Sequence, residues 1–249
     1  MAIRGVIWYQ GEDDGRNKKY TGEFTGMIES WRKLWGQPKM PFYFVQIAQT
    51  GYASGMLGVW ESQVEVMRDV PHTGLAVAND IYDGQKTGYA PRPDKLDKLT
   101  GWPIAGGSNP HPPNKQLVAN RLADIALVKT YGQGDRVVFG PVFESMKITG
   151  SKIVVKLKHA GSGLKTTGGE LNWFEISDGV QERRKIKYVK AQAKIIAPDT
   201  IEVHSPEVKS PKHVRFAWYA LARHNLVNSA GLPATSFRTD RLPGMWNRR

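Results

Sequence analysis

Apolar residues in the first half of the chain follow two spacings in turn. Continuous apolar runs, which predict strands buried on both faces, occur at residues 5–9, 41–47 and 73–78. Apolar residues at helical spacing, which predict amphipathic helices, occur at residues 20–35, about 57–70 and about 115–131. Strands that alternate with helices in this way predict a parallel sheet with helices packed against it.

The second half of the chain has a different pattern. After Gly134, short runs of alternating apolar and polar residues are separated by Gly, Asn and Pro, which is typical of antiparallel strands. The predicted strands are residues 146–148, 152–158, 173–176, 195–196, 200–204 and 213–218. We therefore expect two domains, an α/β domain over residues 1–134 and a β-rich accessory domain over residues 135–249 that forms a small β-sandwich.

Composition excludes several classes of site and partner. Hydrophobic residues make up 40% of the 249 residues, as in a globular protein. No apolar run approaches the roughly 20 residues of a membrane-spanning helix, so we predict no membrane partner. The chain has no cysteine, which excludes disulfides, thiolate metal sites and a cysteine nucleophile.

The net charge of +12 is concentrated in the second half. Residues 1–134 hold 15 Lys and Arg against 13 Asp and Glu, whereas residues 135–249 hold 20 against 10. The densest basic stretch, residues 183–190, is typical either of a strand with one solvated face or of a nucleic-acid-binding patch. Because no recognised nucleic-acid-binding motif accompanies it, we favour the strand and predict no nucleic-acid partner.

Polar residues follow two of the predicted parallel strands directly. Gln10, Gly11 and Glu12 come after the first strand, and Asn79 and Asp80 come after the third. In such sheets, ligands bind beyond the carboxyl ends of the strands. Gly11 would let a backbone N–H approach a ligand and Gln10 would donate a side-chain hydrogen bond, although a glycine after a strand is also an ordinary turn residue.

Acidic residues in the same region raise the question of a cation. Asp13, Asp14 and Asp80 offer oxygen ligands, but they lack the spacing of an EF-hand loop. We therefore interpret them as a solvated acidic loop and predict no metal site.

One histidine differs from the other five in its position. His111 lies at the end of a long loop that begins at Asp80, and prolines on both sides restrict the backbone just before a predicted helix. An esterase of the Ser-His type needs an imidazole in a fixed place to accept the proton of its nucleophile. His111 is therefore either such a base or an ordinary loop histidine beside a proline-started helix.

Several segments together resemble the sialate O-acetylesterase family, within the SGNH-like hydrolases. The most specific are GVIWYQGE at residues 5–12 and HPPNKQ at residues 111–116. Others are WRKLWG at 31–36, PFYFVQIA at 41–48, WESQ at 60–63, NDI at 79–81, RLA at 121–123, VRFAW at 214–218 and GLPA at 231–234. The resemblance thus extends over nearly the whole chain.

The resemblance implies hydrolysis of acetyl esters on sugars through a Ser-His centre, in a three-layer, flavodoxin-like α/β fold without metal or cofactor. By position, His111 would be the general base, and Gln10 and Gly11 would help to form the oxyanion pocket. Glu12 would be a further polar group at the same site, with Asn79 and Asp80 as substrate-binding residues. The implied partner is an acetylated carbohydrate.

The sequence departs from the family pattern in two places. The family's nucleophile lies in a G-Q-S-N block upstream of W-Y-Q-G-E, which these residues do not include, so we expect a truncated, incomplete sheet and a chain that is inactive alone. At the positions of the family's acid near the histidine this sequence has Ser108 and Asn109, and the candidates to replace that acid are Asp80 and Asp83. The alternative is a non-catalytic carbohydrate-binding or assembly module. Location, oligomeric state and the particular sugar stay open.

Overall fold

The computed structural model describes residues 3–49, 55–81, 101–102, 114–182 and 185–240. The chain forms two compact units. The first, called the α/β unit here, comprises Met1–Ala90 and Gly107–Phe139. The second, called the β unit, comprises Pro91–Gly106 and Gly140–Arg249. The segment around Trp102 therefore belongs to the β unit, although it precedes the last helix of the α/β unit.

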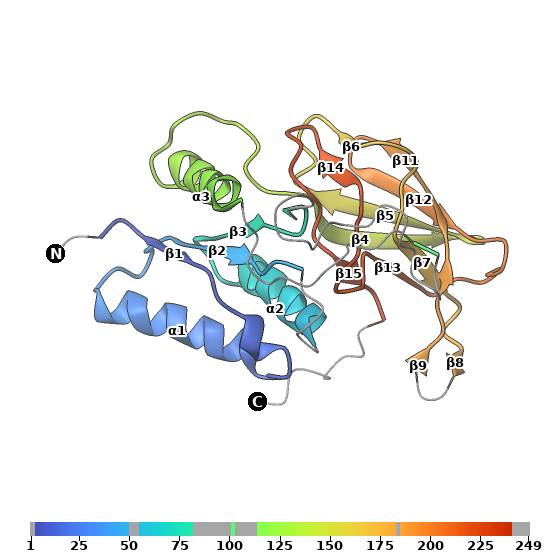
Figure 1. Ribbon diagram of the computed structural model, residues 1–249, viewed down its shortest axis with the longest axis horizontal. Coiled ribbons are helices and arrows are strands. Elements are labelled where there is room, and N and C mark those ends of the chain that lie inside the picture. Colours follow the sequence, from blue (N-terminus) through green and yellow to red (C-terminus); the bar gives the residue numbers. More distant parts are fainter. Residues whose placement is uncertain (1–2, 50–54, 82–100, 103–113, 183–184, 241–249) are drawn as a thin grey trace. The chain divides into compact units, whose positions relative to one another are not determined.

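The α/β unit is built on a parallel sheet, as predicted (Figure 1). Its strands are β1 (Val6–Trp8), β2 (Phe42–Gln46) and β3 (Thr73–Val77), in the order β1-β2-β3. Val6 pairs with Phe42, and Phe42 pairs with Thr73, so the strands begin level with one another. All three carboxyl ends therefore lie at one edge of the sheet.

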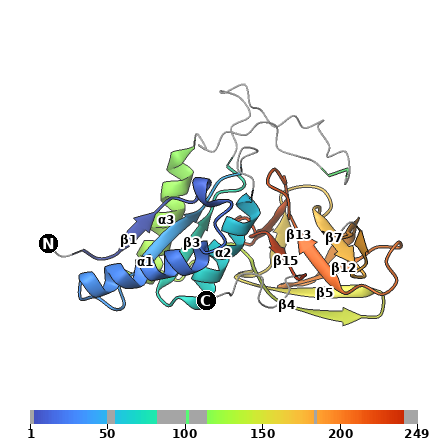
Figure 2. The same ribbon diagram turned by 90° about the horizontal axis from the view of Figure 1, so that it is seen from below.

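Helices pack on both faces of this sheet (Figure 2). They are α1 (Tyr20–Leu34), α2 (Met56–Asp69) and α3 (Lys115–Lys129), close to the predicted ranges. Phe42 and Phe44 pack with α1 and α2, whereas Tyr43 and Val45 pack with α3. None of the helices in the described ranges is both long and apolar enough to cross a membrane.

The prediction that the first strand is buried on both faces is wrong. The side chain of Ile7 is 68% exposed, and Val6 and Trp8 are only half-buried. Strand β1 lies at an edge of the described sheet, and the core beside α3 is formed by residues of the other two strands. A continuous apolar run in the sequence predicts a strand, but it does not reveal whether that strand lies in the middle or at an edge of the sheet.

The predicted apolar stripe of α1 also differs from the structure at its end. Trp31 and Trp35 are 36% and 39% exposed, whereas Arg32 is buried. The Arg32 guanidinium donates hydrogen bonds from Nε to Met40 O at 3.0 Å and from Nη2 to Pro71 O at 2.7 Å. Burial lowers the pKa of Arg32. The side chain thus satisfies backbone carbonyls just before β2 and β3, a role that hydrophobic spacing cannot predict.

The β unit contains two four-stranded antiparallel sheets. One has the order β11 (Gln192–Ala197), β12 (Thr200–His204), β5 (Lys152–Lys158) and β4 (Val142–Thr149). The other has the order β10 (Val189–Lys190), β7 (Phe174–Ser177), β13 (His213–Phe216) and β15 (Phe237–Arg238). Smaller pairs join β6 (Leu164–Thr166) to β14 (Leu226–Asn228), and β8 (Gln181–Glu182) to β9 (Lys185–Ile186).

The two larger sheets share one hydrophobic core. Val155 and Ile201 from the first sheet and Phe174 and Phe216 from the second are fully buried in it, together with Trp173. Antiparallel strands were predicted for this half of the chain, and the structure confirms them.

The basic stretch at residues 183–190 was predicted as a single strand, which is wrong. Its described residues form β9 and β10, with Lys187 and Tyr188 between the two strands, and Arg183 and Arg184 lie outside the described residues. Strand β9 pairs with β8, and Lys187 N donates to Val180 O at 2.9 Å. Lys187 Nζ also lies 2.8 Å from Glu182 Oε1. The alternation of charged and apolar residues therefore reflects a hairpin followed by a separate strand.

Candidate functional site

The candidate site lies at the carboxyl edge of the parallel sheet (Figure 1). There β1 leads into Gln10 and Gly11, and a short 3-10 helix, η1 (Glu12–Asp14), follows. Strand β3 leads into Asn79 and Asp80. The structure therefore places these predicted site residues at one edge of one sheet, each following its predicted strand.

Gly11 is required by the shape of the turn. Its φ of 144° lies in a region that side-chain-bearing residues rarely adopt. A Cβ atom there would lie 2.9 Å from Val59 Cγ1 and 3.2 Å from Ile47 Cγ2, so α2 and the end of β2 close around the backbone. The glycine allows the chain to pass between them and still present the following residues at the edge of the sheet.

Gln10 is held by its neighbours on both its backbone and its side chain. Its Nε2 donates to Asp14 Oδ2, and the Tyr20 hydroxyl donates to the Gln10 carbonyl oxygen at 3.2 Å. The side-chain amide is therefore engaged with η1 in this structure. The amide carries two N–H groups, so it could donate one to an oxyanion and keep the other on the Asp14 carboxylate.

Gln63 organises this edge from α2. Its side chain is fully buried, and Oε1 accepts a hydrogen bond from Ile47 N at 3.2 Å. Its Nε2 donates to Val45 O at 3.1 Å and to Gln10 O at 3.3 Å. One amide therefore joins the ends of β1 and β2. Hydrophobic spacing does not reveal this role, although a polar residue between the apolar Trp60 and Val66 on the inner face of a helix is a usable signal.

Asp80 is held by a buried arginine of α3. Arg121 Nη1 and Nη2 donate to the two Asp80 carboxylate oxygens, each at 2.6 Å, and Nη1 also donates to Val77 O. This two-pronged pair connects α3 to the end of β3. Asn79, next to it, is only 3% exposed. The role of Asp80 as an acid for His111 stays a prediction, and Arg121 would share the same carboxylate.

Tyr9 places a neutral phenol at this edge. Burial, reinforced by the nearby negative charge of Glu12, raises the pKa of Tyr9 to about 12, while the backbone N–H of Ala48 acts in the opposite direction. Lys115 Nζ lies 5.3 Å from the centre of the Tyr9 ring. Because Lys115 is the first residue of α3, this contact brings the start of that helix next to the end of β1.

The expected site also includes residues that precede α3 in the sequence. Asn114 caps the helix, since its Oδ1 accepts a hydrogen bond from Leu117 N at 3.0 Å. His111 lies outside the described residues, as do Asp83, Ser108 and Asn109. Within the described ranges, no group of three or more His, Asp or Glu side chains is arranged to hold a metal ion.

Comparison with known proteins agrees with the resemblance noted in the sequence. A family model described as carbohydrate esterase, sialic acid-specific acetylesterase, matches residues 1–87, the segment that includes Gln10, Gly11 and Asp80. The chain is related to the sialate O-acetylesterases. A sialate O-acetylesterase of Mus musculus is 28% identical over 177 residues, which are 64% of this chain and 29% of that protein. The one of Pongo abelii is 24% identical over 237 residues, 88% of this chain and 41% of that protein.

A solved structure extends the sialate O-acetylesterase relationship to the fold. It is a carbohydrate acetylesterase from Xanthomonas citri, with a TM-score of 0.77 and 31% identity. The match covers 97% of this chain and 51% of that one. This chain therefore spans about half the length of its structural relative and less than half the length of the curated relatives.

Proposed function

We propose that this chain is the histidine-bearing part of a carbohydrate O-acetylesterase that hydrolyses acetyl esters on sugars. The observation that carries the proposal is that the family match over residues 1–87 contains the polar groups that gather at the carboxyl edge of the sheet. Gly11, Gln63 and the Arg121–Asp80 pair fix that edge in place.

The proposed reaction is acyl transfer through a serine. The serine hydroxyl attacks the acetyl carbonyl carbon while His111 accepts its proton, and His111 then returns the proton to the departing sugar oxygen. The same histidine then deprotonates a water molecule, whose oxygen attacks the acyl carbon; acetate leaves and the serine oxygen takes the proton back from the histidine. Gln10 and Gly11 would donate hydrogen bonds to the negatively charged oxygen of each tetrahedral intermediate. The nucleophilic serine would come from a block that the 249 residues do not contain.

The experiment begins with the DNA upstream of Met1. An in-frame segment that encodes G-Q-S-N supports the esterase, and a stop codon directly before Met1 counts against it. The extended protein is then assayed for acetate release from 9-O-acetyl-N-acetylneuraminic acid. We expect turnover that His111→Ala and replacement of the added serine by alanine each reduce by about 10³-fold or more.

A matched histidine separates the active-site role from a general effect on folding. His72→Asn alters an exposed histidine just before β3, at the opposite end of that strand from Asp80, and should leave turnover unchanged. Hydrolysis that survives His111→Ala would refute the assigned base. For the chain as given, we expect negligible hydrolysis of p-nitrophenyl acetate. Clear turnover that Ser108→Ala abolishes would refute the proposal that the nucleophilic serine lies outside these 249 residues.

A further inference from the structure

The β unit has a cavity of its own, with a volume of about 820 Å³. This volume falls within the range of about 300–1,000 Å³ that is typical of small-molecule sites. The cavity follows β11, the edge strand of its sheet. All of its lining residues belong to the β unit, so it is separate from the candidate active site in the α/β unit.

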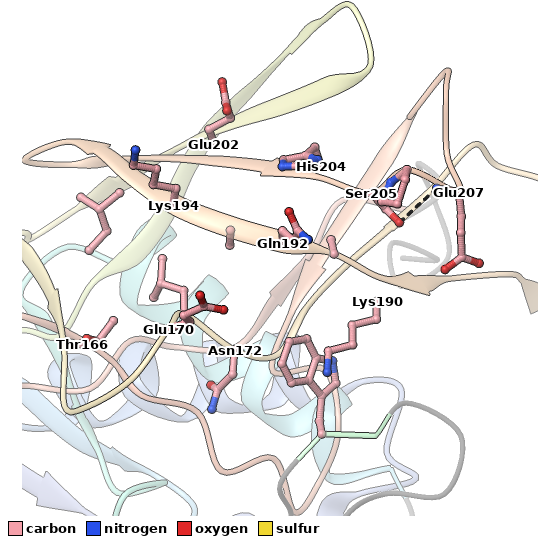
Figure 3. A pocket seen from close by; sticks show the side chains of 16 residues that line it. Thr166, Glu170, Asn172, Lys190, Gln192, Lys194, Glu202, His204, Ser205 and Glu207 are labelled. Atoms are coloured by element: carbon pink, nitrogen blue, oxygen red, sulfur yellow. Dashed lines mark hydrogen bonds between the residues drawn. The ribbon is translucent and has the colours of Figure 1, made fainter.

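One wall of the cavity is a set of polar side chains on neighbouring strands. Gln192 of β11 lies opposite His204 of β12, and Lys194 lies opposite Glu202. In antiparallel strands, residues paired in this way project from the same face of the sheet. Figure 3 shows the four side chains together on these two strands, where they offer both hydrogen-bond donors and acceptors.

On the other face of β11, where Ala193 and Ile195 pack against the core, the lining is more rigid and partly aromatic. Asn172 exchanges side-chain-to-backbone hydrogen bonds with Asn225 at 3.2–3.3 Å, so its position is fixed. Trp102 also lines the cavity and stacks on Trp173 with ring centres 6.2 Å apart. Lys190 Nζ lies 3.9 Å from the centre of the Trp102 ring. Glu170 is exposed in this part of the lining beside Asn172 (Figure 3).

The charges of the lining are mixed. The lining includes Lys190 and Lys194 as well as Glu170 and Glu202, and Glu202 Oε1 lies 2.7 Å from Lys152 Nζ of β5. The lining has positive and negative side chains as well as amide and imidazole groups. It suits a ligand that has many hydroxyls, because each hydroxyl donates one hydrogen bond and accepts others. A strongly anionic or purely apolar ligand would leave part of this lining unsatisfied.

From this chemistry we propose that the cavity along β11 is a saccharide-binding site, which would hold a glycan through its hydroxyl groups. The choice of a saccharide rests in part on the proposed function, since a glycan that carries an acetyl ester has further sugar residues for a second site to hold. An edge strand such as β11 can also bind an extended peptide, which pairs with it as an additional strand of the sheet. The polar side chains of Gln192, Lys194, Glu202 and His204 favour the saccharide, because a strand added at the edge would use mainly backbone groups.

Binding is measured on the chain as it is, by isothermal titration calorimetry with lactose, N-acetyllactosamine and 3′-sialyllactose. We expect at least one of them to bind, and the double substitution Gln192→Ala with Lys194→Ala to weaken binding about tenfold or more, since it removes two hydrogen-bonding groups. The matched control is Lys147→Ala, an exposed lysine on β4 of the same sheet that does not line the cavity. It should leave the affinity unchanged.

The site is located independently by the indole N–H signals in a ¹H–¹⁵N spectrum. The titration should shift the signal of Trp102, assigned with Trp102→Phe, and leave that of Trp31 in the α/β unit in place. Absence of binding by all three saccharides at about 20 mM, which would nearly saturate even a site with a Kd of about 1 mM, would overturn the proposal. So would binding that the double variant does not weaken.

In a second arm of the experiment, the chain is titrated with a strand-forming hexapeptide of alternating Thr and Val. If it binds at β11 and the saccharides do not, the edge is a strand-addition site and the saccharide proposal fails. The esterase is tested separately through His111 in the other unit. Hydrolysis without saccharide binding at β11 would refute only the saccharide-binding site. Saccharide binding without hydrolysis would refute only the proposed function.

Discussion

At the scale of single residues, the candidate site depends on one buried amide. Gln63 uses both ends of its side chain to hold the backbone at Gln10, Val45 and Ile47. The positions of Gln10 and Asp80 at the sheet edge could be predicted from the order of strands and helices. The role of Gln63 could not, because hydrophobic spacing does not tell which backbone groups at the strand ends lack partners.

Gln63→Leu should destabilise the protein by about 2–4 kcal/mol, because it leaves buried backbone groups of β1 and β2 without hydrogen bonds. The free energy of unfolding in urea measures this. The control is Gln116→Leu on α3, where the amide is exposed and bonds only to Asn120 Oδ1 at 3.1 Å in the described structure. A change there should stay within about 0.5 kcal/mol. Equal effects of the two substitutions would contradict the role assigned to Gln63.

The phenol of Tyr9 gives a prediction about pH. Burial is the largest cause of its raised pKa of about 12, and the charge of Glu12 adds to it. Glu12→Gln should therefore lower the pKa of Tyr9 while leaving it above the ordinary value of about 10. Absorbance of the ionised phenol, with the Tyr9→Phe spectrum subtracted, measures the change. Asp13→Asn, a neighbouring and exposed substitution, should have no such effect.

The same group links stability to pH. In the folded protein Tyr9 holds its proton more tightly than in the unfolded chain, where its pKa is about 10. Its contribution to the free energy of unfolding is therefore complete below about pH 10 and is lost as the pH rises towards about 12. Tyr9→Phe should flatten the decline over this range. An unchanged decline would show that Tyr9 titrates normally.

At the scale of secondary-structure elements, the helices were easier to predict than the environment of the strands. The apolar spacing gave α1, α2 and α3 within a few residues of their observed ends, because caps and breakers such as Asn114 and Gly36 mark them locally. The exposure of Ile7 depends instead on which strand stands at the edge of the sheet, and sequence spacing does not carry that information.

The attachment of α3 to β3 should depend on the Arg121–Asp80 pair. The Arg121 side chain is 8% exposed, and both of its terminal nitrogens contact the carboxylate. A double-mutant cycle with Arg121→Met and Asp80→Asn should give a coupling energy of about 1–3 kcal/mol in urea unfolding.

Arg136 and Asp124 provide the matched pair, since Nη2 and Oδ1 are 2.7 Å apart but the side chains are 46% and 48% exposed. The same cycle with Arg136→Met and Asp124→Asn should give about 0.5 kcal/mol or less. A coupling at Arg121–Asp80 no larger than this would show that the pair does not hold α3 in place.

At the scale of the whole molecule, the two units have separate hydrophobic cores. Trp60 is fully buried in the core of the α/β unit, and Trp173 is 1% exposed in the core of the β unit. The change in hydrophobic pattern along the sequence predicted the two kinds of architecture. It did not predict that Trp102 lies in the β core, because its neighbours in sequence carry no strand pattern.

Separate cores predict two calorimetric unfolding transitions. Trp60→Ala should lower the midpoint of one and Trp173→Ala that of the other, since each substitution costs about 3–5 kcal/mol in its own core. The two substitutions control for each other. A single transition that both shift equally would mean that the units unfold as one cooperative body.

The burial of Trp102 has a consequence for where the chain can be cut. The residue belongs to the β unit but comes before α3 in the sequence, so the polypeptide enters the β unit, returns to the α/β unit and enters the β unit again after Phe139. A version that ends at Phe139 would keep an indole whose packing partners are gone. The β unit is therefore not an appendage that trimming can remove, and the segment bearing His111 is tied to both units, by Trp102 before it and by α3 after it.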